Sequence, residues 1–125
     1  MKFIFQALAL LFAGFLVAGF TAAALAPPDT MFGRFALTPW DKLSHFLAFL
    51  CLAVVIGLTA PRNWLYRVCL ALAVYGLALE YLQTGSGRTA SLVDAGANLL
   101  GILAGAVPLR LLRPERRRSK RYKTS

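Results

Sequence analysis

The sequence predicts an all-α fold, a membrane-embedded four-helix bundle with both termini in the cytoplasm. Hydrophobic residues make up 58% of the 125-residue chain and charged residues only 15%, a composition far more apolar than that of soluble domains. The apolar residues gather into four runs, residues 3–25, 43–60, 64–82 and 92–112. Each run is close to the roughly 20 residues with which a helix crosses the hydrocarbon core of a bilayer.

The formal net charge of +9 is concentrated after the last apolar run. We therefore expect one four-span transmembrane domain, residues 1–112, and a basic cytoplasmic tail, residues 113–125. Lys2, Arg62 and this tail would share one side of the membrane, and an excess of Lys and Arg marks the cytoplasmic side. The predicted location is the bacterial inner membrane, with membrane lipids as partners. No nucleic-acid partner is expected, because no folded basic module with interleaved aromatic residues accompanies the tail.

The first apolar run, residues 3–25, is expected to be a retained helix. It is longer than the 7 to 15 residues of a usual signal-peptide core. The small residues Gly14, Ala18 and Ala22 are spaced by four, so this face is expected to pack closely against a neighbouring helix. Residues 26–39 then form the longest connection.

The second apolar run has start signals for a helix. Thr38 is the expected N-cap, Pro39 the first helical residue and Asp41 the acid of a capping box. The run ends before Pro61, and a turn of only three to four residues leads into the third run. Helices joined by so short a turn are antiparallel neighbours.

The fourth run carries a polar stripe. Ser91, expected to be its N-cap, is followed by Asp94, Asn98, Gly101 and Gly105 at spacings that share one helical face. Such a stripe is unsuited to lipid, because its carboxylate and amide need partners. The two glycines offer a flat track for helix packing, either within the bundle or to a partner protein.

The predicted topology brings seven polar residues together at the outer ends of three helices. These residues are Asp41, His45, Glu80, Gln83, Arg88, Asp94 and Asn98. One interpretation is structural, with the two aspartates as caps and the others as hydrogen bonds between helices. A second is ligand binding, since Glu80 has no cap to serve and intramembrane acids are costly.

The third interpretation is enzymatic, with His45, Asp41 and Glu80 as candidate catalytic residues. His45 would be the general base, oriented by Asp41 or Asp94. Arg88 and Asn98 would hold an anionic or carbonyl oxygen, and the substrate would be an envelope headgroup whose phosphate meets Arg88. Whether the protein is an enzyme stays open at this point.

Metals and cofactors are not expected from the sequence. One histidine with scattered acids is a poor match to the usual ligand sets of metal sites. Phosphate-binding loops and dinucleotide fingerprints are absent from the sequence. Cys51 and Cys69 are expected at different depths of antiparallel helices, as buried small apolar side chains that form no disulfide.

In these residues the chain resembles the VanZ-like family of small polytopic membrane proteins, named after a member associated with teicoplanin resistance. The resemblance is carried by four motifs in order, Asp41-Lys42-x-x-His45-Phe46-x-x-Phe49, Glu80-x-x-Gln83, Arg88, and Asp94-x-x-x-Asn98-x-x-Gly101-x-x-x-Gly105. It implies four membrane spans and a connection to the cell envelope or to glycopeptide antibiotics, but no defined reaction. The expected function is binding of an envelope component, such as an anionic lipid-linked headgroup or precursor.

Overall fold

The computed structural model describes residues 1–35 and 38–114, and within these residues the regular structure is entirely helical. Its elements in chain order are α1 (Lys2–Ala24), α2 (Met31–Phe35), α3 (Trp40–Thr59), η1 (Arg62–Trp64), α4 (Leu65–Gly85) and α5 (Leu92–Leu112). The four long helices are long and apolar enough to span a membrane. Within the described residues the chain is therefore all-helical, with four helices typical of a multi-pass membrane protein, and these helices match the four predicted apolar runs to within a few residues.

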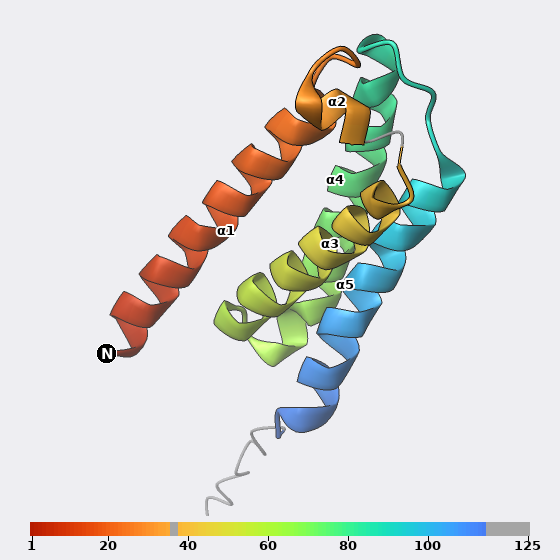
Figure 1. The fold of residues 1–125 in the computed structure, drawn as a ribbon. Helices are drawn as coiled ribbons and strands as arrows, with labels where there is room; N and C mark the ends of the chain where they lie inside the picture. The colour runs from red at the N-terminus through yellow and green to blue at the C-terminus, as the bar shows by residue number, and fades with distance from the viewer. Residues whose placement is uncertain (36–37, 115–125) are drawn as a thin grey trace, which may run out of the picture.

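Helix α3 lies at the centre of the bundle and packs most closely on α5 (Figure 1). The glycine stripe of α5 makes this close approach: Gly101 faces the carbonyl of Phe46, and a Cβ at Gly105 would lie 2.9 Å from the Leu50 oxygen. The expected glycine track is thus confirmed as a packing surface inside the chain. Helix α3 covers this face in the structure.

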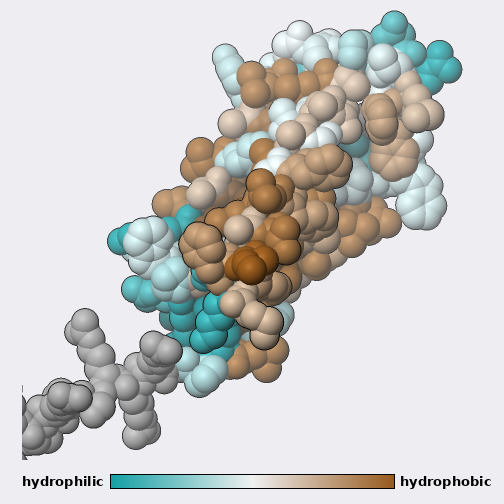
Figure 2. Space-filling view, turned by 90° about the vertical axis from the view of Figure 1, so that its left-hand side faces the viewer, coloured by the Kyte–Doolittle hydropathy of each residue, from teal (hydrophilic) through white to brown (hydrophobic). Residues whose placement is uncertain are grey.

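Helix α1 lies at the periphery and leans away from the bundle towards its N-terminus (Figure 1). Its only fully buried residues are Ala13 and Ala24. The small residues Gly14, Ala18 and Ala22 are exposed, so the expectation that they form the packing face is wrong. The larger residues of the opposite face, such as Phe20, pack against the core instead. Apolar side chains cover the middle of the α1 side of the molecule, and hydrophilic ones gather at both ends (Figure 2).

The connection after α1 contains a short helix that we did not expect. Thr30 begins α2 by accepting a hydrogen bond on Oγ1 from the backbone N–H of Gly33 at 3.1 Å. Gly33 packs against the backbone of Pro27 so closely that a Cβ has no room.

The expected capping box at the start of α3 is wrong. The Thr38 hydroxyl donates instead to the carbonyl of Phe35 at 2.6 Å. Pro39 is the N-cap, and no side chain in the described part of the chain caps this helix end. The Asp41 carboxylate is instead directed to His45 one turn on and to Arg88.

The start of α1 and the end of α5 lie at the same end of the bundle, while α2 and the α4–α5 connection lie at the other (Figure 1). This is the arrangement that an even number of spans predicts. Residues 115–125 of the predicted tail lie outside the described residues. Cys51 is exposed and Cys69 is partly buried, and both are free thiols. The expectation that both are buried is wrong, because the outer faces of these helices are as apolar as the inner ones.

Candidate polar binding site

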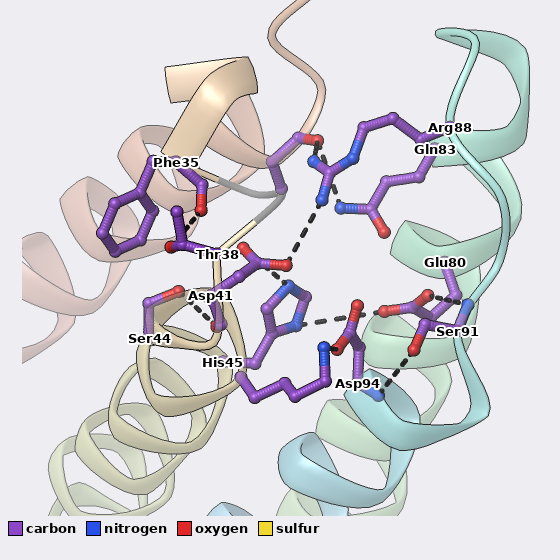
Figure 3. Close-up of polar contacts among 12 residues, drawn as sticks. Phe35, Thr38, Asp41, Ser44, His45, Glu80, Gln83, Arg88, Ser91 and Asp94 are labelled. Atoms are coloured by element: carbon purple, nitrogen blue, oxygen red, sulfur yellow. Dashed lines mark hydrogen bonds and ion pairs between the residues drawn. The ribbon is translucent and has the colours of Figure 1, made fainter. Parts of the chain in front are cut away.

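Polar side chains converge at the end of the bundle that holds the α4–α5 connection (Figure 3). The first turns of α3 and α5 and the last turns of α4 supply them. Six of the seven predicted residues are at most 6% exposed: Asp41, His45, Glu80, Gln83, Asp94 and Asn98. The seventh, Arg88, has an 11% exposed side chain and reaches in from the connection. The fold thus brings all seven predicted residues together, and we call them the polar cluster.

His45 occupies the middle of the polar cluster. Its Nδ1 forms a hydrogen bond of 2.8 Å with Oδ1 of Asn98 on α5. Its Nε2 faces Oδ1 of Asp41 at 3.9 Å, which is beyond hydrogen-bonding distance. The ring of Phe20 packs edge-to-face against the imidazole, with centroids 5.1 Å apart, and also against the fully buried Phe49. The imidazole is therefore held in one orientation between an amide and a carboxylate.

Glu80 caps the start of α5, contrary to the expectation that it has no cap to serve. Its Oε2 accepts a hydrogen bond of 3.1 Å from the backbone N–H of Ser91. Ser91 Oγ in turn accepts from the backbone N–H of Asp94 at 3.2 Å, which confirms Ser91 as the predicted N-cap. In a capping box the acid at Asp94 would return the second bond. Here the acid comes from α4, so the two helices are joined at this point.

Arg88 and Gln83 bind the C-terminal end of α1. Nη1 of Arg88 and Nε2 of Gln83 both donate to the carbonyl of Ala24, at 2.7 and 3.1 Å. Nη2 of Arg88 donates to Oδ2 of Asp41 at 3.3 Å. A helix end and a carboxylate thus engage the guanidinium of Arg88 in the structure, and its role at a ligand phosphate stays a prediction.

Lys42 belongs to the site, although we did not predict it as a site residue. Its Nζ lies 3.5 Å from Oδ1 of Asp94, while its side chain is 47% exposed. Lys42 directly follows Asp41 in the sequence, but sequence spacing alone does not show that the Lys42 side of α3 faces α5. The backbone carbonyl of Ala24 and the ring of Phe20 are further contacts of the polar cluster that no sequence motif marks.

The carboxylates of the polar cluster are not fully compensated. Arg88 pairs with Asp41 and Lys42 with Asp94, whereas Glu80 has no Lys or Arg partner among the described residues. Three buried atoms lack a hydrogen-bond partner in the described part of the chain: Oε1 of Glu80, Oδ1 of Asp94 and Nδ2 of Asn98. Buried polar atoms without partners are uncommon in native proteins and call for a reason.

Three side chains of the polar cluster have the geometry of a metal site. Asp41, His45 and Asp94 each offer one ligand atom, and these atoms all lie within 4.8 Å of one another. We expected no metal because the acids are scattered along the sequence. Packing of α3 against α5 brings them to one point.

An apolar groove of about 250 Å³ between α4 and α5 adjoins the polar cluster. Its lining is Ala73, Gly76, Leu77, Ala95, Gly96, Asn98, Leu99 and Ile102. Asn98 therefore belongs to both the groove and the polar cluster. Its Oδ1 is hydrogen-bonded to His45, while its unpartnered Nδ2 lies close to Gly76.

Comparisons with protein-family models, with curated proteins and with solved structures found no match to this chain. The resemblance to the VanZ-like family thus rests on the ordered motifs in the sequence. Function has to be inferred from the chemistry of the polar cluster and of the groove beside it.

Proposed function

We propose that this protein is a VanZ-like multi-pass protein of the bacterial inner membrane that binds a lipid-linked component of the cell envelope. In this proposal both termini are cytoplasmic, and the polar cluster receives the headgroup on the outer side. Such binding would also alter how glycopeptide antibiotics meet that component. The proposal implies no cofactor.

The observation that carries the proposal is the place of Asn98. This residue lines the apolar groove and also hydrogen-bonds to the central histidine of the polar cluster. A lipid-linked molecule has an apolar and a polar part, so it needs an apolar groove that continues into a polar pocket. The unpartnered Nδ2 of Asn98 supplies a donor where the two meet.

A purely structural role accounts for only part of the polar cluster. Hydrogen bonds between α1, α3, α4 and α5 hold the helices together, as that interpretation requires. It gives no reason for three buried atoms without partners, which a ligand would satisfy. Catalysis by His45 as a general base is less well supported, because its side chain is only 1% exposed.

The test is native mass spectrometry of the protein, extracted gently from its own membrane, with a variant that fills the groove. Gly96 lines the groove, and a Cβ there meets no described atom within 4 Å. Gly96→Leu therefore adds bulk to the groove without displacing a packed side chain. Gly14→Leu is the matched control, since Gly14 is equally open but lies on α1.

We expect a lipid-linked molecule to co-purify with the wild type and with Gly14→Leu, and to be lost from Gly96→Leu while that variant stays folded. Equal amounts of co-purified lipid in all three samples would place the lipid outside the groove between α4 and α5. Absence of any bound molecule from the folded wild type would overturn the proposed function and favour the structural interpretation.

A further inference from the structure

One nitrogen of the His45 ring, Nδ1, is hydrogen-bonded to Asn98, and the other, Nε2, faces the carboxylate of Asp41. Nδ1 is 2.8 Å from Oδ1 of Asn98, and an amide oxygen can only accept. In the tautomer in which Nδ1 donates to this oxygen, the lone pair of the neutral imidazole is on Nε2. That nitrogen faces Oδ1 of Asp41 at 3.9 Å. A lone pair facing a carboxylate oxygen is a repulsive arrangement unless a cation lies between them.

The two aspartates and His45 together form a group that could hold a cation. Asp41, His45 and Asp94 present ligand atoms within 4.8 Å of one another, and all three residues are buried. Arg88 holds Oδ2 of Asp41 at 3.3 Å, which leaves Oδ1 turned towards the histidine. Metal ligands in proteins are commonly oriented in this way by hydrogen bonds from outer residues, here Asn98 and Arg88.

Unpartnered buried oxygens give independent support for a ligand at this point. Oδ1 of Asp94 and Oε1 of Glu80 have no hydrogen-bond partner among the described residues. Their side chains are only 7% exposed and point towards His45 (Figure 3). The 3.5 Å contact to Lys42 is made by a side chain that is about half exposed and is free to swing aside.

We propose that Asp41, His45 and Asp94 bind a divalent transition-metal cation. One imidazole nitrogen with two carboxylates suits Zn²⁺ or Mn²⁺ better than Mg²⁺ or Ca²⁺, which prefer oxygen ligands alone. Small side-chain shifts bring such ligands to the roughly 2.0 to 2.2 Å of Zn²⁺ coordination. Three protein ligands leave at least one coordination position open.

A bound cation makes the net charge of the polar cluster positive, as the binding of an anionic headgroup requires. With neutral His45, the three carboxylates outnumber Lys42 and Arg88, and Arg88 is already engaged. A divalent cation reverses this balance and offers its open position to a phosphate oxygen. This last step rests on the proposed function and narrows its ligand to a phosphate-bearing lipid, whereas the cation site itself does not depend on it.

The chain contains a single histidine, so labelling with ¹⁵N-histidine reports on His45 alone. Protein in detergent, purified without a histidine tag and treated with EDTA, is titrated with Zn²⁺ and, as a control, with Mg²⁺. We expect Zn²⁺ to shift the Nε2 resonance at one ion per chain while Nδ1 stays protonated, and Mg²⁺ to leave both unchanged. An unchanged Nε2 resonance in folded protein at saturating Zn²⁺, or an imidazole protonated on both nitrogens that ignores the ion, would overturn the proposal.

A matched pair of variants locates the ligands by equilibrium dialysis of Zn²⁺. Asp94→Asn removes a buried carboxylate of the ligand set, whereas Asp29→Asn removes an exposed carboxylate that lies outside the polar cluster. We expect Asp94→Asn to weaken Zn²⁺ binding at least about tenfold, because even the loss of an outer residue costs a metal site about that much. Asp29→Asn should keep one Zn²⁺ per chain with an affinity within a few-fold of the wild type.

Native mass spectra of the same samples separate the two proposals. Zn²⁺ binding without any co-purified lipid leaves the cation site standing and removes the lipid-binding function. A co-purified lipid in a protein that binds no Zn²⁺ does the reverse. If Asp94→Asn does not fold, the histidine spectrum of the wild type still decides the question.

Discussion

At the scale of the residue, the main result is that a side chain from one helix caps the start of another. Glu80 on α4 accepts the backbone N–H of Ser91, while Ser91 caps α5 through the N–H of Asp94. The helix start has free N–H groups and a partial positive charge, so a carboxylate is stabilising there. This gives the buried acid Glu80 a structural role in addition to any role in binding.

The hydrogen bond that Glu80 accepts from Ser91 and the negative charge of Glu80 can be removed separately. Glu80→Ala leaves the Ser91 N–H without its acceptor, and we expect a loss of about 1 to 3 kcal/mol in unfolding free energy. Glu80→Gln keeps an amide oxygen that accepts the same bond and should stay within about 1 kcal/mol of the wild type. Reversible unfolding in mixed micelles measures both. Equal losses in the two variants would mean that the charge of Glu80, and not its hydrogen bond, stabilises the protein.

At the scale of the element, the contact between α3 and α5 positions the site. Gly101 and Gly105 let the α5 backbone approach the carbonyls of Phe46 and Leu50. Only this close approach puts His45 within 2.8 Å of Asn98 and gathers the two aspartates. Small residues at helix interfaces are the usual means by which membrane helices come close, because lipid gives no hydrophobic driving force for association.

A methyl group added to α5 at its contact with α3 should therefore change stability differently from a methyl group added elsewhere on α5. Gly101→Ala places a Cβ against the Phe46 carbonyl, and we expect a loss of about 1 to 3 kcal/mol in unfolding free energy from overpacking. Gly96→Ala is the control, since its Cβ meets no described atom within 4 Å. It should gain up to about 1 kcal/mol from helix propensity. A Gly101→Ala variant as stable as this control would contradict the close approach.

At the scale of the whole molecule, four apolar helices place the polar cluster at one end and the ends of the described chain at the other (Figure 1). Arg62, Arg110 and Arg113 lie at the end opposite the polar cluster. Arg113 binds the carbonyls of Gly57 and Ala60 at the end of α3. By the distribution of Lys and Arg, this basic end is the one we expect in the cytoplasm.

The orientation is testable with single cysteines at the two ends. In a background with Cys51 and Cys69 replaced by alanine, the exposed residues Asn63 and Thr89 are changed to cysteine one at a time. We expect a membrane-impermeant maleimide to label Thr89→Cys in intact cells and Asn63→Cys only after permeabilisation. The opposite pattern would turn the polar cluster to the cytoplasm and exclude an outer-side ligand.

The sequence by itself determined the helical class, the four apolar runs, the Ser91 cap and the identity of all seven polar-cluster residues. Runs of about 20 apolar residues and i, i+3, i+4 spacings are local properties, which a single segment carries whatever it packs against. The packing face of α1 and the exposure of Cys51 could not be predicted from one segment, because the outward-facing and buried surfaces of these helices are equally apolar. Only the tertiary structure decided that Glu80 caps α5, that Arg88 is occupied by α1 and Asp41, and that two distant aspartates meet at His45. These contacts depend on the distance and rotation between helices, which spacing along one chain segment does not specify.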